Sequence, residues 1–316
     1  MELYFEEPRI RIHIVGIGGG GNNAINRMVE QNIPMVNYIS LNTDDGAFQR
    51  SKADKRLQIG LQKTKGYGAG SNPEVGRLSA EEDAKAIEEA IKGCDLLFIT
   101  SGMGGGTGTG AAPVVAEIAR KLGILTVAVV TKPFFFEGKR RIEQANMGIE
   151  SLSEIVDALI VIPNDNLKHV SAEKITLNNA FEIADDVLVQ TVKNIVEVIQ
   201  KTAFINCDFA DIRSVLQNSG RMHTATGIIE GAGRTEDLIR QIRSSALLGS
   251  SVENANGILL FVVATDDTPL EEVEQITSAV ADLADPDANI IFGMNFSSED
   301  NNELRAVLLA THRMRK

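Results

Sequence analysis

Two glycine-rich segments, each following a strand and opening a helix, constrain this chain more than any other feature of its sequence. Residues 16–21 read GIGGGG after the apolar run at 10–15, and residues 104–110 read GGGTGTG after the apolar run at 95–100. Glycine lets backbone N–H groups approach a bound anion, and a helix N-terminus adds a favourable dipole. Because parallel strands deliver their carboxyl ends to one edge of a sheet, the two segments predict neighbouring anion-binding loops.

Short apolar runs alternate with helical segments through the first half of the chain. This pattern is typical of a parallel sheet whose two faces are covered by helices. The expected strands are 10–15, 36–41, 95–100, 124–130 and 158–162, and the expected helices are 23–31, one opened by a capping box at 79–82, and 111–122 with Pro113 in its first turn. The sequence therefore predicts an α/β fold.

Apolar residues then recur at helical spacing from Leu177 to Ile199, which predicts one long helix over about 177–200. After it the expected elements are a helix near 234–246, a strand at 258–264, a helix opened by a capping box at 268–271, and strands near 289–294 and 305–311. We therefore expect a Rossmann-like parallel-sheet nucleotide domain (1–176), a long central connecting helix (177–203) and a smaller α+β domain (204–316).

Composition excludes several classes of function. The 31 basic and 43 acidic side chains give a net charge of −12, which repels a phosphate backbone, so no nucleic-acid partner is expected. The longest apolar run, 258–264, falls well short of the roughly 20 residues that cross a bilayer, so no direct membrane insertion is expected. The two cysteines form neither a disulfide framework nor a CxxC pair, which favours a cytoplasmic protein.

The identity of the bound anion is the next question. Residues 16–21 match the GxGxxG pattern of dinucleotide-binding domains, with Asp44 or Asp45 as a candidate ribose-binding acid, so an NAD-type oxidoreductase is one alternative. The second glycine segment argues against it, because one pyrophosphate does not require two such loops. A triphosphate would use both, together with the hydroxyl groups of Thr107 and Thr109. No GxxxxGK[ST] motif occurs, which excludes a P-loop nucleotidase.

The segment GGGTGTG resembles the signature of the tubulin/FtsZ superfamily of GTPases, and its surroundings are similar to the branch that acts in bacterial cell division. Further stretches agree in the same order: GGGGNNAINRM at 18–28, NTD at 42–44, GAGSNPEVGR at 68–77, TKPFFFEGKRR at 131–141, IPND at 162–165 and NCDFADIR at 206–213. The resemblance implies a GTP-binding and GTP-hydrolysing protein that polymerises head to tail and builds the division ring at midcell. A non-hydrolysing tubulin-like scaffold is a further alternative.

The resemblance also implies where the nucleotide binds. It assigns phosphate and guanine contacts to Gly19, Gly20, Gly21, Asn22 and Asn23; γ-phosphate contacts to Gly68, Ala69 and Gly70; α- and β-phosphate contacts to Gly104, Gly105, Gly106, Thr107, Gly108, Thr109 and Gly110; the ribose and phosphate edge to Glu137 and Arg141; and the guanine pocket to Asn164, Phe181 and Asp185. On their own, these residues have simpler interpretations: 68–70 as a turn, Glu137 and Arg141 as solvated charges, and Phe181 as part of the core.

Phe181 and Asp185 are four residues apart on the expected long helix and so share one face. An aromatic ring can stack on a base there, and a carboxylate can accept from the N1–H and exocyclic amine of guanine. Adenine offers no such pair of donors. This spacing favours the guanine-pocket interpretation of Phe181.

Three polar residues after the long helix, Asn206, Asp208 and Asp211, are the candidate catalytic group. Two carboxylates and an amide can polarise water for phosphoryl hydrolysis, although Asp208 or Asp211 can equally cap a helix. The span from Asp185 to Asp208 is about 35 Å at roughly 1.5 Å per residue, so these acids are expected to act on the nucleotide of a neighbouring subunit.

The expected partners and cofactors follow. The main partner is a second copy of the chain in a head-to-tail homopolymer, and the resemblance implies membrane adaptors or division proteins that bind a C-terminal tail absent from this sequence. GTP or GDP is the expected bound nucleotide, with Mg²⁺ held by its phosphates rather than by protein ligands, and with K⁺ as a possible accompanying ion. The four histidines show no spacing typical of metal ligands.

Overall fold

The computed structural model describes residues 10–169, 174–200, 203–244, 252–297 and 303–312. Its strands form one ten-stranded sheet in the order β3-β2-β1-β4-β5-β6-β7-β10-β8-β9. The strands are β1 (Ile12–Ile17), β2 (Val36–Asn42), β3 (Lys55–Gln58), β4 (Leu96–Gly102), β5 (Leu125–Lys132), β6 (Ala158–Pro163), β7 (Gly220–Glu230), β8 (Ala255–Ala264), β9 (Ala284–Phe296) and β10 (Glu303–Thr311). The α/β class predicted from the sequence is confirmed.

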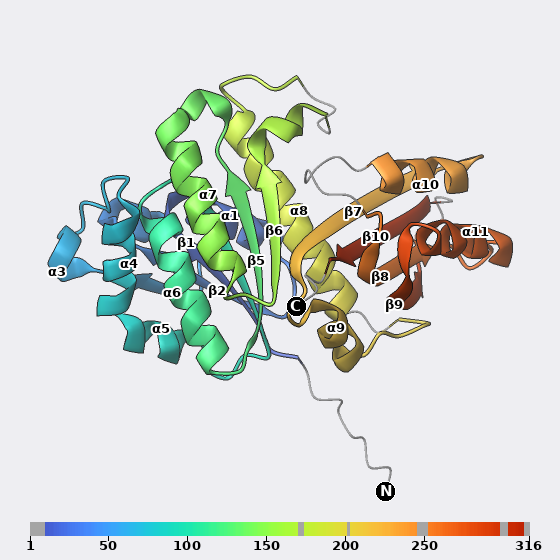
Figure 1. Ribbon diagram of the computed structural model, residues 1–316, viewed down its shortest axis with the longest axis horizontal. Helices are drawn as coiled ribbons and strands as arrows, with labels where there is room; N and C mark the ends of the chain where they lie inside the picture. Colours follow the sequence, from blue (N-terminus) through green and yellow to red (C-terminus); the bar gives the residue numbers. More distant parts are fainter. Residues whose placement is uncertain (1–9, 170–173, 201–202, 245–251, 298–302, 313–316) are drawn as a thin grey trace, which may run out of the picture.

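The helices fall into three groups, which Figure 1 shows around the sheet. The first half contains α1 (Gly18–Glu30), α2 (Asp45–Arg50), α3 (Leu61–Thr64), α4 (Pro73–Glu82), α5 (Ala84–Ile91), α6 (Thr107–Lys121) and α7 (Lys139–Ser153), with short 3₁₀ turns at Phe135–Glu137 and Asn164–His169. The long helix is α8 (Ala180–Gln200), and the C-terminal half contains α9 (Phe209–Leu216), α10 (Arg234–Ser244) and α11 (Leu270–Ala281).

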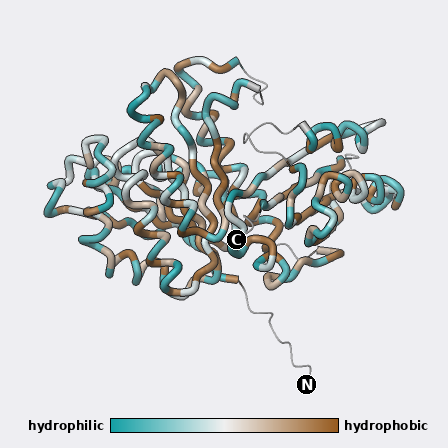
Figure 2. Tube along the Cα trace, in the orientation of Figure 1, coloured by the Kyte–Doolittle hydropathy of each residue, from teal (hydrophilic) through white to brown (hydrophobic). Residues whose placement is uncertain are grey.

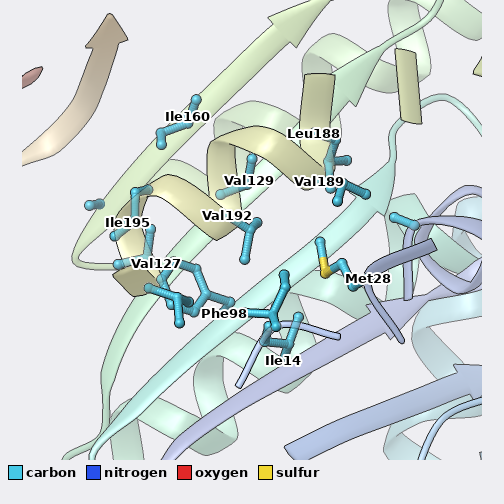
Figure 3. Packing of buried hydrophobic residues seen from close by; sticks show 14 of the residues in the cluster. Ile14, Met28, Phe98, Val127, Val129, Ile160, Leu188, Val189, Val192 and Ile195 are labelled. Atoms are coloured by element: carbon cyan, nitrogen blue, oxygen red, sulfur yellow. The ribbon is translucent and has the colours of Figure 1, made fainter. Parts of the chain in front are cut away.

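Strands β1 to β6 are parallel to one another and carry helices on both faces. On one face α1 and α8 pack against β1, β4, β5 and β6, and Figure 3 shows Met28 of α1 and Leu188 and Val192 of α8 on the same side of the sheet as Phe98 and Val129, in one buried cluster. On the other face α5, α6 and α7 cover a second buried cluster. Figure 2 shows the hydrophobic segments gathered in these central strands. The continuous apolar runs of the sequence therefore reflect burial on both faces.

The C-terminal half continues the same sheet through a short junction. Strand β7 pairs with β6 in parallel at Ala158 with Gly220 and Leu159 with Arg221. Beyond it β10 runs antiparallel to both β7 and β8, and β9 runs parallel to β8. The amide of Asn194 in α8 donates to the hydroxyl of Thr226 at 3.0 Å. Helix α8 thus contacts both halves of the molecule, as expected of a connecting helix.

Several element boundaries differ from the expectation. Helix α1 begins at Gly18, directly after β1, because glycines let its first turn lie on the strand: a Cβ on Gly16 would lie 2.4 Å from the carbonyl oxygen of Gly21. Helix α6 begins at Thr107, so Pro113 lies well inside the helix and not in its first turn. Strands β3 and β7 and helix α4 were not expected. The expected end of the helix near 246 lies outside the described residues.

Both expected capping boxes are wrong, because the hydroxyl groups of Ser79 and Thr268 hydrogen-bond to other partners. Ser79 lies inside α4 and donates to the carbonyl oxygen of Val75 at 2.8 Å, and α5 begins after Asp83. The hydroxyl of Thr268 accepts from Nη2 of Arg234 at 3.1 Å, and α11 begins at Leu270 without a side-chain cap. None of the helices in the described part of the chain is long and apolar enough to span a bilayer.

Candidate functional site

A pocket of about 410 Å³ lies where β1, β4, β5 and β6 end. It is lined by Gly19, Gly20, Asn23, Ser71, Gly102, Met103, Gly105, Gly106, Thr107, Gly108, Thr131, Pro133, Glu137, Arg141, Asn164, Phe181, Ala184 and Asp185. Carboxyl ends of parallel strands are where open α/β sheets bind ligands. Twelve of these eighteen lining residues were expected from the sequence, so the fold brings most of the candidate site together.

The first glycine segment divides into lining and packing residues. A Cβ on Gly19 would meet nothing within 4 Å, so this glycine faces open space, and Asn23 is exposed beside it. Gly21 does not line the pocket, because a Cβ there would lie 2.5 Å from the carbonyl oxygen of Thr100. Asn22 is buried, and its amide, in the orientation that suits its neighbours, donates to Gly16 O at 2.9 Å. These two residues support the loop from behind.

The second glycine segment divides in the same way. Gly105, Gly106, Thr107 and Gly108 line the pocket, and a Cβ on Gly105 would meet nothing within 4 Å. The hydroxyl of Thr109 accepts from the backbone N–H of Gly104 at 2.8 Å, and Gly104 itself has φ +97. A Cβ on Gly110 would lie 1.9 Å from the carbonyl oxygen of Pro73. Gly104, Thr109 and Gly110 therefore shape the turn and let α6 approach α4.

The segment 68–71 lies against the second glycine segment. Only its last residue, Ser71, lines the pocket. A Cβ on Gly106 would come within 2.8 Å of the Cβ of Ala69. Gly68, Ala69 and Gly70 are not among the lining residues, whereas Ser71 is. The backbone has positive φ at Gly68 (+82), Gly70 (+57) and Ser71 (+58), which explains the glycines at the first two positions.

The far end of the pocket combines an aromatic ring with an unsatisfied amide. Phe181 is 49% exposed and not a core residue, and its ring meets that of Phe134 edge-on at a centroid distance of 5.6 Å. Asn164 is 4% exposed, and its Oδ1 is buried without a hydrogen-bond partner among the residues that the structure describes. A buried orphan acceptor costs free energy, so a ligand that donates to it gains affinity. This end of the pocket is built to receive a flat group with hydrogen-bond donors.

Asp185 lies at the same end of the pocket, and opposing influences act on the pKa of its carboxyl group. The pKa of Asp185 is raised to about 7, chiefly by burial and also by the nearby charges of Asp186 and Glu182, against the guanidinium of Arg27, which lowers it. A ligand that donates hydrogen bonds to the carboxylate would favour its ionised form. The protonation of Asp185 is therefore coupled to what occupies the pocket.

Glu137 and Arg141 form the side wall of the pocket and are not a solvated charge run. Arg141 Nη1 lies 2.6 Å from Glu137 Oε2, and Glu137 Oε1 accepts from the backbone N–H of Phe134 at 2.9 Å. The Glu137 side chain is only 10% exposed. This pair fixes the turn between β5 and α7 where it faces the pocket.

The candidate catalytic residues lie at the other end of α8. Asn206, Asp208 and Asp211 do not line the pocket, and Figure 1 shows α9 beyond the C-terminal end of α8, away from Phe181 and Asp185 in its first turns. A helix of 21 residues is about 31 Å long. Asp208 caps α9 by accepting from the backbone N–H of Asp211 at 2.8 Å, as the helix-capping alternative expected. Asn206 and Asp211 are exposed.

Six lining residues were missed by the sequence analysis: Ser71, Gly102, Met103, Thr131, Pro133 and Ala184. Most lie inside or next to the motifs quoted above, but no pattern distinguishes them from their neighbours. Within the described residues, no three His, Cys, Asp or Glu side chains gather as metal ligands. A Mg²⁺ ion brought by a nucleotide would therefore take its ligands mainly from phosphates and water, with the Thr107 hydroxyl nearby.

A larger groove of about 760 Å³ between α4, α6 and α7 is a weaker candidate site. Three of its charged side chains pair with one another: Arg77 Nη2 lies 2.6 Å from Glu74 Oε1, and Arg77 also pairs with Glu81. The described residues place no orphan polar atom and no strongly shifted carboxyl in it. The smaller pocket holds both.

Comparison with known proteins covers nearly the whole chain. The family model described as "Tubulin/FtsZ family, GTPase domain" matches residues 11–172, and "FtsZ family, C-terminal domain" matches residues 220–313. An empty FtsZ dimer from M. jannaschii is 41% identical with a TM-score of 0.90, covering 98% of this chain and 90% of that one. A mutant FtsZ of the same organism is 41% identical with a TM-score of 0.88, covering 96% and 92%.

A more distant match is a GTPγS-bound protofilament of CetZ2 from Haloferax volcanii. It is 20% identical with a TM-score of 0.80, covering 97% of this chain and 94% of that one. At that identity the likeness extends to the fold alone.

Proposed function

Because this chain belongs to the tubulin/FtsZ family of GTPases, we propose that it binds GTP in the pocket at the carboxyl ends of β1, β4, β5 and β6, hydrolyses it to GDP and phosphate, and assembles head to tail into filaments that act in cell division. The observation that carries this proposal is that one pocket combines two kinds of binding group, exposed glycine backbone and polar side chains that accept hydrogen bonds. Open glycine backbone forms one end, and the other carries the amide oxygen of Asn164, which has no hydrogen-bond partner among the described residues, and the half-buried carboxyl of Asp185.

Guanine fits the second end. Its N1–H and exocyclic amine supply the two donors that a carboxylate at Asp185 accepts, and its ring can stack on Phe181. A donor group of the nucleotide would also satisfy Oδ1 of Asn164. Family membership and this donor–acceptor match favour GTP over the dinucleotide alternative.

The triphosphate fits the first end. Backbone N–H groups at Gly19, Gly20, Gly105 and Gly106 can approach phosphate oxygens without side-chain interference, and the N-termini of α1 and α6 point their dipoles there. Mg²⁺, when it accompanies the nucleotide, neutralises phosphate charge during hydrolysis. The segment 68–71 is placed to respond to the terminal phosphate through its contact with Gly106.

Hydrolysis requires groups that orient water. Among the described residues that line the pocket, only Asp185 and Glu137 carry carboxyl groups; Asp185 is proposed to bind the base, and Glu137 pairs with Arg141. Asn206 and Asp211 are exposed and polar at the opposite end of α8. Head-to-tail stacking brings this end of one subunit to the pocket of the next, so the active site is completed only in the filament. The acids then orient water against the terminal phosphate.

A role in division at midcell, rather than another filament role, is favoured by the difference in identity between the matches: 41% to FtsZ of M. jannaschii against 20% to CetZ2. We propose that this protein is located in the cytoplasm, at the midcell division site. Membrane adaptors and other division proteins are its proposed partners.

The test measures binding and turnover separately. Purified protein is titrated with GTP and ATP in the presence of Mg²⁺, and phosphate release is followed over a range of protein concentrations. The expected result is preference for GTP and a specific activity that rises with protein concentration. Equal affinity for ATP would overturn the nucleotide assignment. Tight GTP binding and assembly without phosphate release would instead support the non-hydrolysing scaffold.

A further inference from the structure

Arg27 of α1 lies against the part of α8 that carries Asp185. Its Nη1 pairs with Oδ1 of Asp186, and its Nη2 lies 3.7 Å from Oε1 of Glu182. Asn23, one helical turn before Arg27, lines the pocket, as does Asp185. Arg27 therefore links the helix that begins among the phosphate-facing glycines to the helix that carries the carboxyl at the base end of the pocket.

Asp185 is surrounded by an unbalanced set of charges. Glu182 and Asp186 come from its own helix, and Arg27 faces it from α1. Across the pocket, Glu137 and Arg141 neutralise each other at 2.6 Å, and Asn164 carries no charge. Burial and the two neighbouring acids raise the pKa of Asp185 to about 7, and the Arg27 charge is the opposing influence. Asp185 therefore depends on Arg27 for its negative charge.

The protonation state of Asp185 decides which purine edge it can pair with. An ionised carboxyl presents two acceptors, which match the N1–H and exocyclic amine of guanine. A protonated carboxyl presents one donor and one acceptor, which match the N1 acceptor and exocyclic amine of adenine instead. The charge that holds Asp185 ionised therefore also discriminates between the two bases.

We propose that Arg27 is a specificity-determining positioning residue of the nucleotide site: held by its ion pairs with Asp186 and Glu182, it favours the ionised form of the neighbouring Asp185 carboxyl and thereby the selectivity of the pocket for guanine. The inference rests on the proposed function of the pocket as a GTP site. It adds a residue that is not among the described lining residues of the pocket but acts on Asp185, which is.

The test compares GTP and ATP affinities of the full chain by titration calorimetry with Mg²⁺ between pH 6 and pH 8.5. Both nucleotides share the same triphosphate, so the ratio of their affinities cancels its titration. In the parent protein this ratio should fall as pH falls below about 7, approaching tenfold per pH unit. In Arg27→Gln the midpoint of this pH dependence, the pH at which Asp185 is half ionised, should move up by roughly one pH unit. The ratio at pH 7 should then fall by about tenfold. Arg27→Lys, which keeps the charge, should restore most of both.

Three further variants separate this role from simple helix packing. Asp185→Asn should bind GTP weakly with a ratio independent of pH, and adding Arg27→Gln to it should change nothing more, because Arg27 acts through Asp185. Glu182→Gln removes a neighbouring negative charge, leaves the pair of Arg27 with Asp186 in place and should move the midpoint down, the opposite direction to Arg27→Gln. It therefore tests the same electrostatic balance even where Arg27→Gln folds poorly.

The results that overturn the inference differ from those that overturn the proposed function. If Arg27→Gln lowers GTP and ATP affinity equally at every pH, or lowers GTP affinity in the Asp185→Asn background as well, Arg27 only holds α1 against α8. If the parent protein prefers GTP at neutral pH while Arg27→Gln and Glu182→Gln both leave the midpoint in place, the inference fails and the proposed function stands. If the parent protein shows no GTP preference at any pH, the proposed function itself fails.

Discussion

The hydroxyl groups of Thr43 and Thr107 lie 2.7 Å apart and share a hydrogen bond that joins the end of β2 to the first residue of α6. Thr43 is fully buried, and its carbonyl oxygen also accepts from the backbone N–H of Gly68 at 3.2 Å. Thr107 lines the pocket. Thr43 therefore connects the segments 104–110 and 68–71: its hydroxyl group bonds to one and its carbonyl oxygen to the other.

Thr43→Val removes this hydroxyl and keeps the shape of the side chain. The free energy of unfolding should fall by about 1 kcal/mol, and GTP should bind several-fold more weakly because Thr107 loses the partner that fixes it. Thr100→Val is the matched control: Thr100 is equally buried, but its hydroxyl has no hydrogen-bond partner, so this change should be neutral or stabilising. Denaturant unfolding and nucleotide titration measure both effects. Equal losses in the two variants would contradict the assigned role of Thr43.

The glycines of the second segment predict two opposite outcomes for the same substitution. Gly105→Ala places a methyl group in open pocket space, so thermal stability should be unchanged while GTP affinity falls by about tenfold or more. Gly110→Ala drives its methyl group to 1.9 Å from Pro73 O and 2.5 Å from Arg77 N, which forces α4 away from α6. It should lower stability by about 1–3 kcal/mol.

Gly108 is a poorer test of phosphate binding than Gly105. A Cβ on Gly108 would lie 2.2 Å from Ser101 Oγ and 2.9 Å from Gly102 O, so a substitution there perturbs packing and the pocket together. If Gly105→Ala binds GTP as the parent does, the backbone at that position does not meet phosphate.

His223 predicts how the protein responds to acid. Burial, with a smaller contribution from the charge of His312, lowers the pKa of His223 to about 4, against about 6.5 in an unfolded chain. The unfolded state therefore binds more protons between these values, so this residue makes stability fall as pH falls from about 6.5 to 4. His223→Gln removes this contribution, so between neutral pH and pH 5 the variant should lose about 2 kcal/mol less unfolding free energy than the parent protein.

Unfolding of the two proteins at pH 7.5 supplies the baseline, because His223 is neutral in both states there and the difference reports packing alone. Asp185 titrates in the same range with the opposite sign, because its raised pKa lets the folded state bind the extra proton. The comparison of parent and variant removes that contribution. A difference in unfolding free energy between parent and His223→Gln that stays constant from pH 7.5 to 5 would contradict the prediction.

The sheet of the first half follows from its sequence because strands buried on both faces are continuous apolar runs. Strand β7 does not show such a run: Met222, His223, Thr224 and Ala225 are all buried, although two of the four are polar. Its burial comes from its position between β6 and β10, with α10 packed against it, and that position is a property of the whole fold. Neither alternation nor hydrophobicity within the strand reveals it.

The glycine segments show the same limit within the candidate site. The sequence indicates that backbone must approach something closely at 104–110, but it cannot distinguish an approach to a ligand from an approach to another helix. Gly105 faces the pocket, whereas Gly110 faces Pro73, which is 37 residues earlier in the chain. The link between Arg27 and Asp186 likewise joins residues 159 apart. Such long-range pairs are set by tertiary packing.

Asp211 offers the cleanest test of a site completed between subunits. Its exposed side chain makes no hydrogen bond or ion pair to other described residues, so Asp211→Ala should leave stability unchanged. The variant should bind GTP and assemble, because its pocket is intact, but it should release phosphate poorly and form long-lived filaments. Asp208 needs the milder change Asp208→Asn, because asparagine keeps the cap of α9 while removing the charge. Sedimentation and phosphate release measure assembly and turnover.

Mixing two inactive proteins then decides whether catalysis crosses the junction. In a filament of Asp211→Ala and Gly105→Ala subunits, some junctions pair the intact pocket of the first with the intact acids of the second. Random mixing at equal amounts makes these about a quarter of all junctions. At a GTP concentration that fills the parent pocket but not the Gly105→Ala pocket, each variant alone should be nearly inactive, and phosphate release should appear on mixing. It should grow faster than linearly with total protein, since each productive site needs two subunits. Asp211→Ala that is fully active alone, with turnover strictly proportional to protein at every concentration, would mean that one chain carries the whole reaction.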